Sequence, residues 1–180
     1  MKQILYYIAI CIIFYSLSIS KAVCINIGQN KDSNARKRII CLLSECCDSL
    51  SKYYLPENNS LNESWKDYNA SKYLYYCETD FNGDKISDFA LILVSKNKKE
   101  LFVCVLLSMN KSYKMLCLQK FEMNDNQIPI VLGIEKKGIW ESANEKKIVR
   151  NDGLIIYWLP ESKSYMYYWS QNRFNRFFSD

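Results

Sequence analysis

The sequence predicts an α+β fold, in which one N-terminal helix packs on an antiparallel β-meander within a single domain. Three observations support this prediction. The 180 residues leave room for one domain, and 49% apolar with 24% charged residues is a globular composition. Apolar residues recur at helical spacing over 34–53. Over 73–178 the pattern changes to short apolar runs separated by turns, which is typical of strands.

The N-terminus predicts an export signal. Met1-Lys2 precedes an uncharged run from Gln3 to Ser20, and Ser20-Lys21-Ala22 has the small-x-small form that signal peptidases cleave. We therefore expect residues 1–22 to be a signal peptide and 23–180 to be an exported domain, periplasmic or secreted. The alternative is an uncleaved anchor, because the run approaches the roughly 18 residues that span a bilayer. The chain would then meet a membrane through that segment alone.

Charge and composition exclude several functions. Removal of residues 1–22 takes away Lys2 and Lys21, so the net charge falls from +5 to +3 and the cysteine count from 8 to 7. Apart from Arg36-Lys37-Arg38 and the lysines of 96–99, the basic residues that remain are spread out and form no stripe, so nucleic acid is not expected as a partner. An exported chain with cysteines works where thiols oxidise, and an odd number leaves at least one outside any internal pair. The chain has no histidine, which excludes Ser-His-Asp and Cys-His catalysis.

The expected elements follow the chain in order. The helix over 34–53 is indicated by residues that share one helical face, namely Ile39, Leu43, Cys46, Cys47 and Leu50. A polar connection over 56–69 follows. Strands are then expected at Tyr73–Cys77, Phe89–Val94, Leu101–Leu107, Lys114–Phe121, Ile128–Ile134, Leu154–Leu159, Tyr165–Trp169 and Phe174–Phe178. The second and third of these are almost wholly apolar, so both of their faces should be covered, one of them by the helix.

One hairpin turn sets the register of a cysteine pair. Folding the chain about Asn110-Lys111 places Cys104 opposite Cys117, in a pair of the closer, non-hydrogen-bonded type. We predict a disulfide between them, since such a pair is within bonding reach. The alternative is two buried thiols that pack as small hydrophobic residues. The connectivity of the other mature cysteines stays open; these are Cys24, Cys41, Cys46, Cys47 and Cys77.

Side-chain oxygens alternate along the segment that precedes the most apolar strand. Ca²⁺ takes about six to eight oxygen ligands, and alternate residues of a tight loop point inward to supply them. We predict a calcium site with ligands from the side chains of Asp80, Asn82, Asp84 and Asp88 and the carbonyl of Ile86. The alternative is that Asn82-Gly83 turns a hairpin and that the acidic side chains are solvated.

Residues 80–90, Asp-Phe-Asn-Gly-Asp-x-x-x-Asp-Phe-Ala, resemble the calcium loop of FG-GAP or VCBS-type repeats. Such loops occur in integrin-like propellers and, as one copy, in small exported bacterial proteins, most without known activity. Trp65 and the segment 153–180 are also similar to those single-copy proteins. Lys85 stands where the family usually has a glycine with left-handed backbone. One copy without internal repeats cannot build a propeller, which leaves a single domain.

The C-terminal strands are crowded with aromatic residues. We predict that Tyr165, Tyr167, Tyr168 and Trp169 offer a partner-binding surface, because Tyr and Trp give large contact areas with few torsions to freeze. The alternative is that cross-strand aromatic pairs fill a second small core.

These features predict an exported, non-enzymatic binding module stabilised by Ca²⁺. It would act as an inhibitor or immunity-type protein whose partner is a toxin or an envelope enzyme. One alternative is an envelope enzyme that cleaves glycans with Glu78, Asp80, Asp84 or Asp88, although carboxylates in one short loop more readily share a cation than flank a glycosidic bond. Another alternative is a structural or adhesion subunit of the cell envelope.

Overall fold

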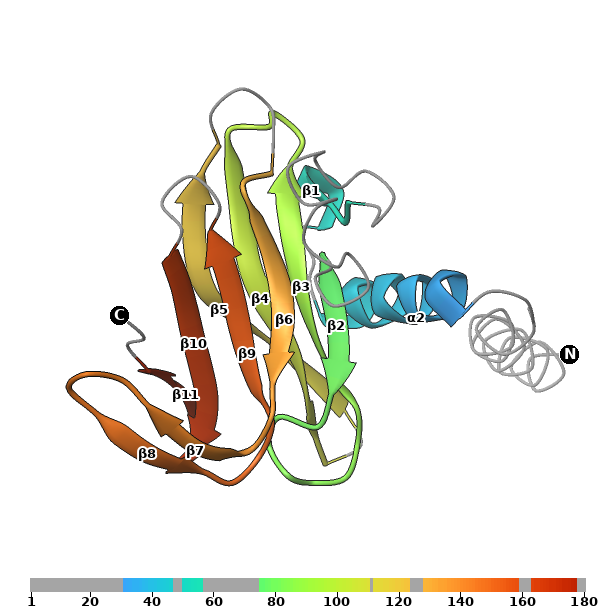
Figure 1. Ribbon diagram of the computed structural model, residues 1–180. Helices are drawn as coiled ribbons and strands as arrows, with labels where there is room; N and C mark the ends of the chain where they lie inside the picture. The colour runs from blue at the N-terminus through green and yellow to red at the C-terminus, as the bar shows by residue number, and fades with distance from the viewer. Residues whose placement is uncertain are drawn as a thin grey trace, which may run out of the picture. The chain divides into compact units, whose positions relative to one another are not determined.

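The computed structural model describes residues 31–46, 50–56, 75–110, 112–123, 128–158 and 163–177 (Figure 1). These residues carry one α-helix, one 3-10 helix and eleven strands. The predicted α+β class is therefore wrong, because the described chain is dominated by antiparallel sheets. The expected signal peptide lies outside the described residues, and no helix within them is long and apolar enough to cross a membrane.

The helix is shorter than the sequence predicts. Helix α2 spans Lys31–Cys46, whereas a helix over 34–53 is expected from the pattern. The end of that range forms instead a 3-10 turn, η1 (Leu50–Lys52), and a short strand, β1 (Tyr53–Tyr54). Aromatic side chains lose rotamer freedom in a helix and fit a pleated surface well, so the two adjacent tyrosines favour strand pairing.

Five strands form the first sheet. They are β1, β2 (Tyr76–Thr79), β3 (Asp88–Ser95), β4 (Glu100–Met109) and β5 (Ser112–Glu122). The order is β1-β3-β4-β5, and β2 also pairs with β3. All pairs are antiparallel. Every residue of β3 is buried, in agreement with the expectation that both faces of this strand are covered.

The later strands separate into two further sheets, which a simple meander does not predict. The second sheet has the order β11-β10-β9-β6, from β6 (Ile130–Glu135), β9 (Gly153–Trp158), β10 (Lys163–Ser170) and β11 (Arg173–Phe177). The third sheet is a hairpin of β7 (Gly138–Glu141) and β8 (Lys146–Val149). Neither of its strands was expected from the sequence, because each has four residues and mixes charged with apolar side chains.

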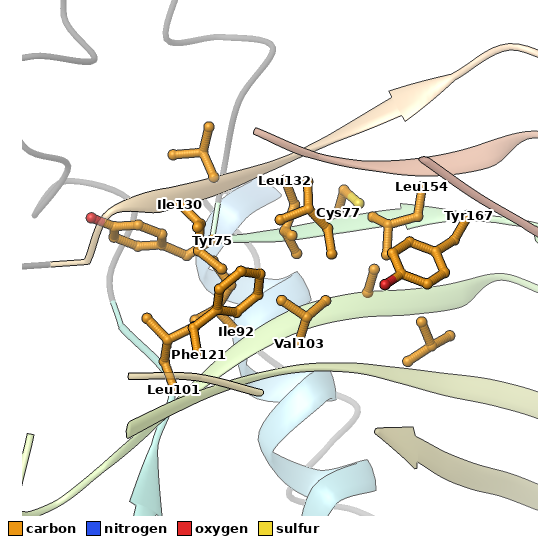
Figure 2. Close-up of a cluster of buried hydrophobic side chains, with 14 of the residues drawn as sticks. Tyr75, Cys77, Ile92, Leu101, Val103, Phe121, Ile130, Leu132, Leu154 and Tyr167 are labelled. Atoms are coloured by element: carbon orange, nitrogen blue, oxygen red, sulfur yellow. The ribbon is translucent and has the colours of Figure 1, made fainter. Parts of the chain in front are cut away.

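The first two sheets pack face to face around one apolar core. Figure 2 shows side chains of both sheets meeting there, among them Ile92, Val103, Phe121, Leu132 and Leu154. Alternate residues of each strand supply these side chains, as in other β-sandwiches. A second, smaller core lies beneath the third sheet and consists of Trp140, Val149, Tyr168 and Phe177. Aromatic residues thus fill a second core, as one alternative from the sequence anticipated.

Candidate functional site

Asp88, the first residue of β3, anchors the loop 80–87. Its side chain is 0% exposed. Oδ1 accepts hydrogen bonds from the backbone N (2.7 Å) and Oγ (2.8 Å) of Ser108, and Oδ2 accepts one from the backbone N of Phe81 (2.8 Å). Burial raises the pKa of Asp88, and the hydrogen bonds from Ser108 and Phe81 oppose that rise. The buried carboxylate therefore ties the loop to β4.

Asp80 closes the first half of the loop. Its Oδ1 accepts a hydrogen bond from the backbone N of Gly83 (2.6 Å), and its Oδ2 accepts one from the backbone N of Lys85 (2.8 Å). Gly83 and Lys85 both have a left-handed backbone, with φ of 84° and 67°. Lys85 thus takes the conformation for which the similar calcium loops use glycine, although a Cβ disfavours it.

Asn82 and Asp84 form a second set of contacts with Ser108. The Asn82 amide nitrogen donates to Asp84 Oδ2 (3.2 Å) and to the Ser108 carbonyl (2.8 Å). The Ser108 hydroxyl, whose one proton is shared with Asp88, lies 2.8 Å from Asp84 Oδ2. The backbone N of Ile86 donates to Asp84 Oδ1 (2.8 Å). Burial alone would raise the pKa of Asp84, but the hydrogen bonds from Ser108, Ile86 and Asn82 outweigh it and lower that pKa.

These hydrogen bonds decide how well the predicted ligands suit Ca²⁺. Every carboxylate oxygen of Asp80, Asp84 and Asp88 accepts a protein donor, and Asn82 turns its amide nitrogen toward Asp84. Within the described ranges, no three Cys, Asp or Glu side chains converge as metal ligands. As arranged, the loop does not fit a shell of about six to eight oxygens. Calcium binding stays a prediction from the sequence.

The left-handed backbone of Lys85 leads to a first test. Replacement of Lys85 by Gly is expected to raise the free energy of unfolding by about 0.5–1 kcal/mol, because the strain of a Cβ at positive φ exceeds the entropy that glycine adds to the unfolded chain. Urea denaturation measures the change. Lys85→Ala is the matched control and should bring no gain, since alanine keeps the Cβ. Equal gains in both variants would contradict this explanation.

A second network holds the connection between β8 and β9 against the loop. Asp152 Oδ2 accepts hydrogen bonds from Thr79 Oγ1 (3.1 Å), at the end of β2, and from Lys136 Nζ (2.8 Å), after β6. A Cβ on Gly83 would lie 2.9 Å from the side-chain oxygen of Asn151, so the two segments are in close contact. The β2–β3 loop, the β6–β7 connection and the β8–β9 connection are therefore fixed to one another at this end of the sandwich.

Large apolar side chains remain exposed around these networks. Ile86 is 40% exposed in the loop and Met109 is 43% exposed at the end of β4. On the third sheet, Ile139 and Ile148 face each other across the hairpin and are 60% and 74% exposed. Figure 1 places the loop, the β4–β5 turn and the third sheet at one end of the packed sheets. We call these four side chains the end patch.

Neither Ser108 nor the end patch was expected from the sequence. Ser108 lies 20 residues beyond Asp88, and no local pattern links them. The two isoleucines belong to the strands that were missed. Their only signal is the alternation of Ile139 with Trp140 and of Ile148 with Val149, which places one residue of each pair on either face of the hairpin.

The aromatic residues predicted to bind a partner are engaged in packing. Tyr167 and Tyr168 are buried in the large and the small core, respectively. Tyr165 and Trp169 are half-buried and pack against the large core. The Arg176 guanidinium lies 4.2 Å from the Tyr165 ring centroid, a cation–π contact. These side chains are placed to stabilise the second sheet.

The predicted cysteine pair is in the expected register. Cys104 lies directly opposite Cys117 on β4 and β5, next to a β-bulge after Val103. Both residues are thiols, as are Cys41, Cys46 and Cys77 in the described part of the chain. The disulfide between Cys104 and Cys117 stays a prediction.

Neither a model of a known family nor any curated protein or solved structure matches this chain. The likeness of residues 80–90 to the FG-GAP or VCBS loop therefore stays a resemblance based on those residues. The geometry described above is the basis for assigning a function.

Proposed function

We propose that this chain is an exported, non-enzymatic module that binds a protein partner through the end patch. The observation that carries the proposal is that four exposed apolar side chains stand on segments fixed by Asp88 and Asp152. Ordered segments lose little entropy on binding, and exposed apolar side chains such as the cross-strand pair Ile139 and Ile148 offer apolar area that a partner can bury. An inhibitor or immunity-type protein that blocks a toxin or an envelope enzyme would use such a surface.

Two of the basic side chains near the end patch are paired with carboxylates. Lys146 pairs with Glu141 on the third sheet, and Lys136 pairs with Asp152 beside it. These basic groups are neutralised within the protein. Nucleic acids and anionic membranes attract surfaces whose Lys and Arg side chains remain available for phosphate.

The acidic residues give less support to a glycan-cleaving enzyme. Asp88 is 0% exposed, so its carboxylate cannot reach a substrate. Asp80 and Asp84 accept hydrogen bonds within their own loop. Glycosidases need two carboxyl groups about 5–9.5 Å apart on either side of an accessible bond. Asp80 and Asp84 lie in one short loop and Asp88 is buried, so these carboxylates do not provide that arrangement.

The end patch can be tested by paired substitutions. The mature protein is used to capture its partner from the native envelope, and the purified partner is then titrated by calorimetry. We expect Ile139→Ser/Ile148→Ser and Ile86→Ser/Met109→Ser each to weaken binding at least about tenfold, because central apolar contacts are worth over about 1 kcal/mol each.

Tyr54 provides the matched control for these variants. It is 38% exposed but pairs with Val94, at the end of β3 far from Asp88. Tyr54→Ser should therefore leave the affinity unchanged. Equal losses in all three variants, or a loss in Tyr54→Ser alone, would contradict the end patch as the binding surface. Turnover of glycan substrates by the purified protein would contradict a non-enzymatic role.

A further inference from the structure

Cys104 and Cys117 differ sharply in exposure although they face each other across two strands. Cys104 is 3% exposed, whereas Cys117 is exposed. On its other side Cys104 lies opposite Leu91 of β3, which is fully buried. The pair thus consists of one thiol that solvent reaches and one that is shielded behind it.

The position of the pair at the sheet edge makes the outer thiol accessible. β5 is the last strand in the order of the first sheet, in the portion of the chain that the structure describes. The β-bulge lies between the pair and the next register position, Val103 with Gln119. Bulges locally break the ladder and increase the twist of a strand. A small reagent can therefore approach Cys117 without displacing a neighbouring strand.

The register also allows the two sulfur atoms to bond. Directly opposed residues of antiparallel strands have Cα atoms about 4.5–5.5 Å apart. Disulfides bridge Cα separations of about 4.4–6.8 Å. Closure of a bond between Cys104 and Cys117 therefore needs no movement of the backbone, and both the dithiol and the disulfide fit the same fold.

We propose that Cys104 and Cys117 form a reactive dithiol that is oxidised by small disulfides, with Cys117 as the attacking and Cys104 as the resolving residue. The Cys117 thiolate attacks one sulfur of the disulfide, whose S–S bond breaks as a mixed disulfide forms and one thiolate leaves. Cys104 gives its proton to solvent and attacks the Cys117 sulfur, which closes the internal bond and releases the second thiolate. The protein loses two electrons, and the small disulfide gains them as two thiols.

The environments of the cysteines support these roles. The hydrogen bond with the Cys104 thiol lowers the pKa of Cys117 to about 7, although partial burial opposes the shift. Cys77 is the opposite case, because burial raises its pKa to about 12. Cys77 therefore serves as an internal reference for an unreactive thiol in the same chain.

The reactivity of this cysteine pair does not depend on partner binding by the end patch.

The test uses the fully reduced protein and oxidised glutathione near neutral pH. Samples are quenched with acid, digested and mapped by mass spectrometry. We expect the wild-type protein to form the Cys104–Cys117 link, and Cys117 to react at least about 100-fold faster than Cys77, because its thiolate fraction is far larger. Cys104→Ala should instead accumulate glutathione on Cys117, since the resolving thiol is gone. Cys117→Ala should leave Cys104 unmodified.

If Cys104→Ala fails to fold, the oxidation experiment on the wild-type protein tests the proposal by itself. Failure of the link to form, or reaction of Cys117 no faster than Cys77, would overturn it. If circular dichroism shows that Cys104→Ala is unfolded, Cys104→Val serves as the second trapping variant. A folded trapping variant that carries glutathione elsewhere, with Cys117 unmodified, would also overturn the assignment of the attacking residue.

Discussion

Replacement of Asp88 by Ala is expected to lower the free energy of unfolding by about 3–5 kcal/mol, because buried donors lose a charged acceptor. The carboxylate is 0% exposed and accepts hydrogen bonds from Ser108 N, Ser108 Oγ and Phe81 N. Alanine leaves the two backbone N–H groups without this acceptor inside the protein. Urea denaturation of both proteins measures the loss, and the circular dichroism spectrum verifies that the variant still folds.

Two variants separate the acceptor role of Asp88 from its size. Ser108→Ala removes one donor, while the Ser108 backbone N still donates to Asp88, so we expect a loss of about 1–2 kcal/mol. Asp88→Asn keeps the volume but presents an N–H₂ group to donors, so its loss should lie between those of the other two. A loss below 1 kcal/mol for Asp88→Ala would show that the loop does not depend on this buried contact.

Except for β1, the strands of both main sheets could be predicted from the sequence, but their division into two sheets could not. Apolar runs such as Phe89–Val94 mark strands because side chains that alternate across a pleat must be buried on one or both faces. Pairing depends on contacts between segments that are distant in the chain, such as β6 with β9, across the inserted hairpin. The helix predicted over 34–53 was too long, because the helix ends at Cys46 and Tyr53 lies in a strand.

The position of the loop 80–87 could be predicted from the sequence, but the hydrogen-bond partners of its side chains could not. The alternation of Asp80, Asn82 and Asp84 before an apolar strand marks an ordered turn, because these side chains accept hydrogen bonds from nearby backbone N–H groups. The same alternation also indicates a calcium loop, and spacing alone does not distinguish the two. The contacts that hold the loop to the first sheet come from Ser108 on another strand, which the local sequence does not reveal.

Replacement of Gly153 by Ala is expected to cost about 2–4 kcal/mol, because no room exists for one added methyl group. Gly153 begins β9, and its Cβ would lie 2.0 Å from Trp140 Cη2 and 2.8 Å from the Tyr167 carbonyl oxygen. The indole has little freedom to move aside, since its Nε1 donates to the Lys136 carbonyl (3.0 Å) and its ring packs edge-on against Phe177. Thermal and urea denaturation measure the cost.

A double-mutant cycle with Trp140→Leu identifies which neighbour causes that cost. Trp140→Leu alone should lose about 2–4 kcal/mol, because it leaves a cavity in the small core. In the double variant the smaller side chain leaves room for the new methyl group, so the combined loss should fall short of the sum by about 1 kcal/mol or more. The rescue is partial because the Tyr167 carbonyl belongs to the backbone of β10 and stays in place. Strictly additive losses would place the clash at that carbonyl and not at the indole, and the small core would then tolerate change at Trp140 independently of β9.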